Sequence, residues 1–360
     1  MPRRAPAPPP RPGPHDLLLS AEAIRAEHAH WADPIVDRSI FGTTSPPDIA
    51  SVFESFCARE LGSPIASARF YRVSVACVAG VTLEDGRPVV LKAQRATRRE
   101  DYLRACAEFR AHLADQGFPC PRILAGPVRT GDAYLTAEDL LETGTLADAH
   151  DPPIRRSIAA ALARIEHLAR DFPSPERFGR SWFTGVPEGR TFPRPHTPLF
   201  DFERTAEGAE WIDALAAEAR ARRFSADSPR TIAHFDFRIE HLRFDGPRLV
   251  ATYDWDSLHH EHPAVWIGTL APHFTADWQR DTVVRAPTLD EMRAFVTDFE
   301  SHRQAPFTSS ERPLLSAAAV YAMAYTARCN HAERPAEEGW NGDLRPLLRA
   351  HARTLLDTGL

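Results

Sequence analysis

Two Asp-Gly pairs, each flanked by β-forming residues, restrict the possible fold of this chain more than any other feature. The first pair lies at residues 85–86, between the β-rich runs 69–83 and 88–93, and the second lies at residues 245–246. An Asp-Gly pair between such runs is the strongest short-range signal for a tight β-hairpin. The sequence therefore predicts antiparallel strands in two separate regions of the chain.

Helical spacing of apolar residues predicts helices on both sides of these hairpins. The expected helices are 16–30, 48–61, 98–116, 154–169, 207–222, 290–300, 312–329 and 344–356. Two further strands, 122–126 and 133–140, follow the helix 98–116, so the first part of the chain has the order strand, strand, helix, strand, strand. This order predicts an α+β fold with an N-terminal antiparallel-sheet lobe and a mainly helical C-terminal lobe.

The length of 360 residues agrees with two lobes, because one domain usually contains about 100–200 residues. A tail rich in proline and arginine, residues 1–15, is expected to be disordered. We expect the N-terminal lobe to span residues 16–140 and the C-terminal lobe to span residues 141–360.

The composition excludes several classes of protein. The net charge of −6, with basic residues spread among acidic ones, argues against nucleic acid as a partner. No apolar run approaches the ~18 residues of a membrane span, and the N-terminus lacks the apolar core of a secretory signal. Five cysteines without a CxxC pair fit neither a disulfide framework nor a zinc site. The expected location is therefore the reducing cytoplasm.

Only one of the 43 basic residues is a lysine, Lys92, which lies near the end of a predicted strand. A lysine ammonium is a compact charge on a slim stem and reaches into narrow pockets that a planar guanidinium does not enter. Lys92 is therefore a candidate binding residue. The alternative, that one lysine survived an arginine-rich coding bias by chance, stays open.

The second hairpin carries histidine and acidic residues on both of its flanks. His234, Asp236 and His241 precede it or lie at its start, and Asp254 follows it. Phosphoryl transfer requires a cation on the phosphates, a group that orients the acceptor hydroxyl and a carboxylate that holds metal ions. Together with Lys92, these residues supply each of those groups.

These motifs resemble those of the aminoglycoside phosphotransferase-like kinases, a family that includes choline kinases and is distantly related to protein kinases. His234-Phe235-Asp236 with His241 resembles the catalytic-loop HxDxxxxN, and residues 253–256 resemble the metal segment IDWE. The resemblance extends over about residues 69–270. It implies a bilobal protein kinase-like fold and transfer of the γ-phosphate of ATP to a hydroxyl of a small, antibiotic- or metabolite-like molecule.

The resemblance also implies roles for individual residues of the C-terminal lobe. Asp236 would be the catalytic base that orients the acceptor, and Arg238 would neutralise the transferred phosphate. Asp254 and His241 would hold the metal ion, which is Mg²⁺ or, as the second candidate, Mn²⁺.

In the N-terminal lobe, residues 89–92 resemble the family's strand that bears the phosphate lysine. Lys92 would contact the ATP phosphates, and Glu108 on the following helix would hold Lys92. Glu138 and Leu140 lie in the stretch that resembles the hinge strand, whose backbone groups would bind the adenine edge.

The sequence departs from the family pattern at three places. His241 stands where the family has asparagine, although Mg²⁺ prefers oxygen ligands. Residues 261–266 lack both aspartates of the acidic pair that usually surrounds the next Pro-Ala. The loop expected to cover the phosphates, near residues 73–80, contains only Gly80 and would cradle phosphates less closely than a glycine-rich loop.

Two other functions remain open, namely a pseudokinase that binds nucleotide without phosphoryl transfer and a protein that binds an unrelated ligand. The retained residues Lys92, Glu108, Asp236 and Asp254 favour the enzyme. The acceptor and the oligomeric state are not predicted. Residues 259–262, His-His-Glu-His, are expected to form a solvated turn rather than a metal site. Several aromatic residues could pack the second lobe, which is favoured, or line an acceptor cleft: Trp182, Phe183, Phe192, Phe200 and Phe202.

Overall fold

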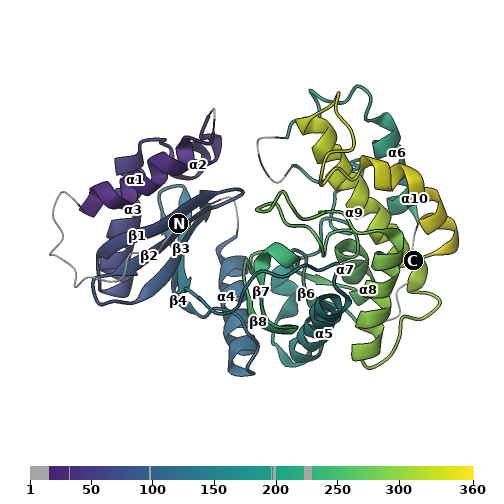
Figure 1. The fold of residues 1–360 in the computed structure, drawn as a ribbon, viewed down its shortest axis with the longest axis horizontal. Helices are drawn as coiled ribbons and strands as arrows, with labels where there is room; N and C mark the ends of the chain where they lie inside the picture. The colour runs from purple at the N-terminus through teal and green to yellow at the C-terminus, as the bar shows by residue number, and fades with distance from the viewer. Residues whose placement is uncertain (1–15, 32, 97–98, 196, 198–199, 223–228) are drawn as a thin grey trace. The chain divides into compact units, whose positions relative to one another are not determined.

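The computed structural model describes most of the chain from residue 16 to residue 360 (Figure 1). The residues it leaves out are 1–15, 32, 97–98, 196, 198–199 and 223–228. The predicted disordered tail, residues 1–15, therefore lies outside the described residues. The described part divides into two compact units, the first with the elements from α1 to β5 and the second with those from α5 to the C-terminus.

The first unit is built on a five-stranded antiparallel sheet with the order β1-β2-β3-β5-β4. The strands are β1 (Ile65–Val73), β2 (Cys77–Leu83), β3 (Pro88–Arg95), β4 (Ile123–Thr130) and β5 (Ala133–Asp139). The predicted hairpin turn joins β2 to β3, and its Gly86 has a φ of 86°, a left-handed conformation that favours glycine. The β-rich run 69–83 is divided between β1 and β2, which form another hairpin in the same sheet.

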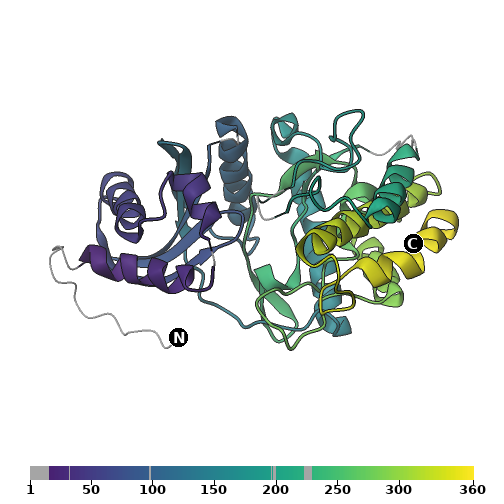
Figure 2. The ribbon, with the colours of Figure 1, turned by 90° about the horizontal axis from the view of Figure 1, so that it is seen from above.

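Three helices cover one face of this sheet (Figures 1 and 2). They are α1 (Asp16–His28), α2 (Ile35–Phe41) and α3 (Pro46–Phe56), the last continuing into a π-helical turn, Cys57–Leu61. Ile24, Ile40 and Phe53 from these helices are buried in one apolar cluster with Leu91 and Leu135 of the sheet. α2 was not predicted, because its seven residues are too few to show a helical period.

The chain between β3 and β4 forms α4 (Glu100–Asp115), as predicted. Leu103, Phe109 and Leu113 on one side of α4 are buried, in agreement with the helical period of the sequence. The expected stop, Gly117, has a φ of 69°, which a residue with a side chain rarely adopts.

The second unit is mainly helical. Its helices are α5 (Pro152–Leu168), α6 (Glu210–Ala221), α7 (Pro263–Leu270), α8 (Leu289–His302), α9 (Arg312–Glu333) and α10 (Arg345–Thr358). α9 packs against α6, α7 and α10 (Figure 1). α7 was not predicted, because all of its residues are buried and its sequence lacks the polar positions that reveal a helical period.

Two small two-stranded sheets complete the second unit. β6 (Thr231–His234) pairs with β9 (Leu258–Glu261), and β7 (Leu242–Asp245) pairs with β8 (Arg248–Thr252) through the predicted Asp-Gly turn. The expectation of a solvated turn at residues 259–262 is wrong, because three of these residues belong to β9. Glu261 is fully buried and accepts a hydrogen bond from Ser181 Oγ at 2.9 Å, so this carboxylate has structural partners.

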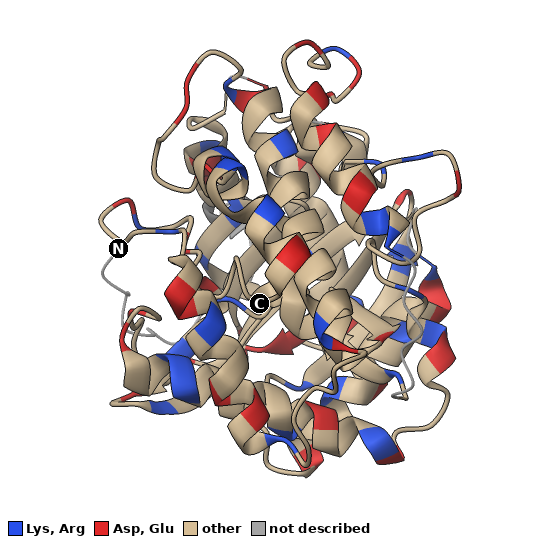
Figure 3. Cartoon of the chain, turned by 90° about the vertical axis from the view of Figure 1, so that its right-hand side faces the viewer, with Lys and Arg blue, Asp and Glu red and all other residues tan. Residues whose placement is uncertain are grey.

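The predicted α+β architecture is confirmed, with an antiparallel sheet in the N-terminal part and helices in the C-terminal part. None of the described helices is long and apolar enough to cross a membrane. Acidic and basic residues are interspersed along the helices that face the viewer in Figure 3.

Candidate active site

The predicted catalytic segment joins β6 to β7 in the second unit. Its start is fixed by the sheet, in which His234 pairs with Leu258 of β9. Near its end, Ile239 N–H donates to the carbonyl of Phe274 at 3.0 Å, and a 3₁₀ turn follows up to His241. Backbone hydrogen bonds thus hold both ends of the segment that carries the predicted catalytic side chains.

The β7–β8 hairpin brings Asp254 to the catalytic segment. Leu242 pairs with Thr252 at the open end of the hairpin, and Tyr253 N–H donates to the carbonyl of His241 at 2.9 Å. Asp254 follows with a φ of 60°, a left-handed conformation that aspartate adopts more readily than most non-glycine residues. The hairpin predicted from the sequence therefore places Asp254 next to the segment that ends at His241.

Asp236, His241 and Asp254 lie close enough together to bind one metal ion, since one ligand atom from each lies within 4.8 Å of the other two. His241 Nε2 is 3.3 Å from Asp236 Oδ2 and 3.8 Å from Asp254 Oδ2. Two carboxylate oxygens and one imidazole nitrogen are a suitable donor set for a divalent ion, in which the oxygens suit Mg²⁺ and the nitrogen suits transition-metal ions better.

Arg238 lies between the carboxylates of Asp236 and Glu240. Its Nη1 forms an ion pair with Asp236 Oδ1, and its Nε donates to Glu240 Oε1 at 2.8 Å. Burial favours the neutral acid, but Arg238 and His241 outweigh burial and hold the pKa of Asp236 below its ordinary value. Asp236 is thus a charged hydrogen-bond acceptor with a fixed cation beside it.

The pKa of His241 depends on the same neighbouring charged groups. Burial and the nearby Arg238 both favour the neutral ring, yet the carboxylates of Asp236 and Asp254 raise the pKa of His241 above its ordinary value. The imidazole therefore faces a strongly negative environment, the kind of environment that attracts a cation.

Glu240 is a residue of this site that the sequence motifs do not reveal. Its side chain is 5% exposed, and its Oε2 accepts the backbone N–H of Trp278 at 2.6 Å. Its Oε1 accepts from Arg238 and lies 3.3 Å from His241 Nε2. The sequence shows an acid at this position but gives no sign of Trp278, which is remote in the chain.

His234 supports Asp236 through the backbone. The ring is fully buried, and its Nδ1 accepts the N–H of Asp236 at 3.2 Å. Burial lowers the pKa of His234 to about 4, so the ring is neutral near neutral pH, as this acceptor role requires. Trp266 Nε1 also donates to the carbonyl of His234 at 2.8 Å. His234 therefore fixes the backbone at Asp236.

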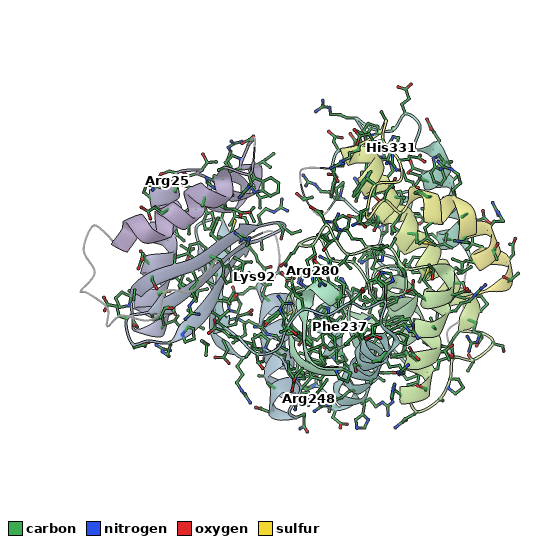
Figure 4. All side chains as sticks on the ribbon, viewed as in Figure 1. Arg25, Lys92, Phe237, Arg248, Arg280 and His331 are labelled. Carbon is green, nitrogen blue, oxygen red and sulfur yellow. The ribbon has the colours of Figure 1, made fainter. Side chains whose placement is uncertain are left out.

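Lys92 lies in the first unit, on β3 (Figure 4). Its neighbours Leu91 and Ala93 belong to the core formed with α1, α2 and α3. Because side chains alternate along a strand, Lys92 points to the opposite face of the sheet. In the register of that sheet, Lys92 stands beside Val78 of β2 and Thr136 of β5.

Glu138 shares the sheet face of Lys92, because it lies two positions beyond Thr136 on β5. Its Oε2 forms an ion pair with Nη1 of Arg110 at 2.5 Å, so α4 reaches this face. Glu108 lies on α4 with an exposed side chain. The sequence does not reveal the role of Arg110, because its partner Glu138 lies on β5, a different element, and only the structure brings the two side chains together.

The predicted hinge residues differ in their backbone environment. Glu138 lies inside β5, paired with Val90 on one side and Ile123 on the other, so its peptide groups belong to the sheet. Leu140 is the first residue after the strand. Of the two, Leu140 is therefore better placed to offer backbone groups to a ligand.

The aromatic residues of the second unit pack around α9. The centroid of the Tyr321 ring lies 5.0 Å from that of Phe183 and 5.6 Å from that of Phe192, and both phenylalanines are buried. Trp182 is half-buried and lies 5.1 Å from the half-buried Tyr325. Packing, the favoured expectation, is confirmed for Phe183 and Phe192.

Comparison with known proteins identifies the family of this chain. The model of the phosphotransferase enzyme family, APH, matches residues 78–295, which is more than half of the chain. The chain therefore belongs to the phosphotransferase enzyme family. No curated protein matches the sequence.

Two solved structures with similar folds are small-molecule kinases. Amicoumacin kinase hAmiN in complex with AMP-PNP, Ca²⁺ and Ami is 11% identical, with a TM-score of 0.56 over 81% of this chain and 89% of that chain. A thermostable mutant of aminoglycoside phosphotransferase APH(4)-Ia, in its apo form, is 14% identical, with a TM-score of 0.50 over 84% and 98%. These likenesses confirm the protein kinase-like fold, and the family makes the chain a small-molecule phosphotransferase.

Proposed function

We propose that this protein transfers the γ-phosphate of ATP to a hydroxyl group of a small molecule. The proposal depends mainly on one observation, the convergence of Asp236, Arg238, His241 and Asp254 at the base of one hairpin. In a member of the phosphotransferase family, such a group of carboxylates with one fixed cation has the components that phosphoryl transfer needs.

In the second unit, Asp236 would orient the acceptor hydroxyl and accept its proton as the hydroxyl oxygen bonds to the γ-phosphorus. The bond between that phosphorus and the β–γ bridging oxygen would break, and ADP would leave. The low pKa of Asp236 keeps it ionised, which suits orientation and charge stabilisation more than strong basicity. Arg238 would place positive charge beside the transferred phosphoryl group. Most of the rate enhancement would come from positioning and electrostatics rather than from covalent chemistry.

In the first unit, Lys92 would contact the ATP phosphates, and Glu108 would hold Lys92. Backbone groups of the hinge residues, mainly Leu140 and also Glu138, would bind the adenine base. Asp254 and His241 would hold Mg²⁺ or Mn²⁺. Bound there, the ion would neutralise negative charge on the phosphates. The AMP-PNP and Ca²⁺ in the hAmiN complex support nucleotide and divalent-ion use.

A screen of hydroxyl compounds for ADP release tests the proposal. With ATP and Mg²⁺, we expect at least one small alcohol to stimulate ADP release above the rate without acceptor, and its deoxy analogue to have no effect. ³¹P NMR of the product identifies the new phosphate ester. ATP binding without ADP release for any compound would favour the pseudokinase, and no ATP binding at all would contradict both functions.

His241→Asn tests whether the imidazole contacts the ion. Asparagine restores an oxygen ligand, so we expect the ratio of Mn²⁺-supported to Mg²⁺-supported activity to fall several-fold. Initial rates at saturating concentrations of each ion measure this ratio in both proteins. An equal ratio would show that the ion does not contact His241, and would leave the carboxylates of Asp254 and Asp236 as the candidate ligands.

A further inference from the structure

The short loop between β1 and β2 lies beside the row of sheet residues that contains Lys92. The loop spans residues 74–76, and Ser74 N–H donates to the carbonyl of Ala76 at 3.1 Å. Cys77, the first residue after the loop, pairs with Ala93, and the next residue pairs with Lys92. The loop is therefore one residue away from the strand position opposite the predicted phosphate lysine.

A buried carboxylate from α2 holds the two strands on either side of this loop. Asp37 is fully buried, and its Oδ1 accepts the hydroxyl of Tyr71 on β1 at 2.5 Å. The thiol of Cys77 on β2 donates to the same oxygen at 3.6 Å, and His28 Nε2 lies 3.4 Å away. Burial raises the pKa of Tyr71 and of Cys77, so both remain protonated donors.

A second carboxylate, from α1, contacts the last residue before the loop. Glu27 is 7% exposed, and its Oε1 accepts the backbone N–H of Val73 at 3.3 Å. Its Oε2 accepts from Arg72 Nη1 at 3.2 Å. Each of the first two helices thus contributes one buried acid to the loop ends, from the sheet face opposite Lys92.

Two features indicate that these contacts do more than stabilise the fold. Burying a carboxylate is costly, and apolar side chains would join α1 and α2 to the sheet with less desolvation. The loop itself contains no glycine, and its Val75 is β-branched, so it does not adapt to phosphates as a glycine-rich loop does. Its conformation must therefore be set by its flanks, which is where Glu27 and Asp37 act.

We propose that α1 and α2 are a fixed support for the nucleotide-phosphate loop, with Asp37 and Glu27 as positioning residues for ATP. The inference rests on the proposed function, since it assumes that the Lys92 face binds the phosphates. The support replaces the adaptability of a glycine-rich loop by holding residues 74–76 in one conformation before the nucleotide arrives.

Tyr71→Phe and Asp37→Asn test this support. Both substitutions are nearly isosteric, and each weakens the buried hydrogen bonds at the loop ends. We expect the KM for ATP to rise about tenfold, the effect of losing roughly one buried hydrogen bond to a charged group, while kcat changes less than twofold. The binding of ADP should weaken similarly, whereas adenosine, which lacks phosphates, should bind as in the wild type.

Ser63→Ala is the matched control, because Ser63 is also buried and accepts the N–H of Asp85 at 3.2 Å at the other end of the sheet. It should lower the melting temperature without changing the KM for ATP. An unchanged KM in folded Tyr71→Phe, or equal weakening of ADP and adenosine, would overturn the inference. Absence of ATP binding by the wild type would instead overturn the proposed function, and the inference with it.

Discussion

Replacing Asp236 with asparagine should lower kcat by about 10²–10⁴, the usual contribution of a positioned acid–base group. The amide keeps the size of the side chain and accepts a hydrogen bond from Arg238, but it does not take the proton of the acceptor. Nucleotide binding should stay nearly intact, because Lys92, the hinge residues and Asp254, which would hold the nucleotide and its metal ion, are unchanged. Coupled ADP release and an ATP-induced thermal shift measure the two effects separately.

Asp245→Asn provides the control for this variant. Asp245 lies at the tip of the same hairpin, its side chain is 69% exposed, and it forms an ion pair with Arg248, whose side chain is 73% exposed. Exposed pairs contribute little to stability, so activity should match the wild type. If Asp236→Asn retained the turnover of the control with an identified acceptor, the assignment of Asp236 as base would be wrong.

Lys92→Ala should remove most of the thermal stabilisation that ATP gives to the wild type. A ligand present at 100 times its Kd stabilises the folded state by about 2.7 kcal/mol, which raises the melting temperature by a few degrees. The phosphates would lose their lysine contact in the variant. Thermal shift titrations with ATP and Mg²⁺ measure the difference directly.

Two further substitutions separate the position from the charge. Lys92→Arg keeps the charge but adds a planar fork, so it should restore little of the shift if the pocket requires a slim ammonium. Arg87→Ala removes an exposed cation at the β2–β3 turn and should leave the shift unchanged. Full function of Lys92→Arg would mean that the single lysine reflects coding bias, and a full shift in Lys92→Ala would remove Lys92 from the nucleotide site.

The fold could be predicted where local chemistry determines it. Asp-Gly turns fixed both predicted hairpins, and the helical period located α4 and α9 within a few residues. Prediction failed where tertiary contacts decide the structure. α7 is buried on all sides and shows no period, and β9 contains His259 and His260, which became a strand because β6 offers them a partner.

In the candidate site, too, the residues joined by local structure could be predicted and those joined by tertiary contacts could not. Asp236, His241 and Asp254 could be grouped because one short hairpin joins them, and the structure places them together. Glu240 and Arg110 were missed because their partners, Trp278 and Glu138, are distant in sequence. A single sequence records which residue types are present, but not which remote backbone groups they meet.

The left-handed backbone at Asp254 restricts which amino acids can replace this residue. Among the amino acids, glycine, asparagine and aspartate adopt such a φ at least cost, and of these only aspartate offers a charged oxygen to a cation. A longer acid such as glutamate would strain the backbone at this φ, so the structure disfavours exchange of the proposed acidic ligand for another acid. The replacements that the backbone tolerates at this position, glycine and asparagine, both remove the negative charge. The proposed metal ligand at this position would therefore be lost in a single substitution, without a weaker acidic intermediate.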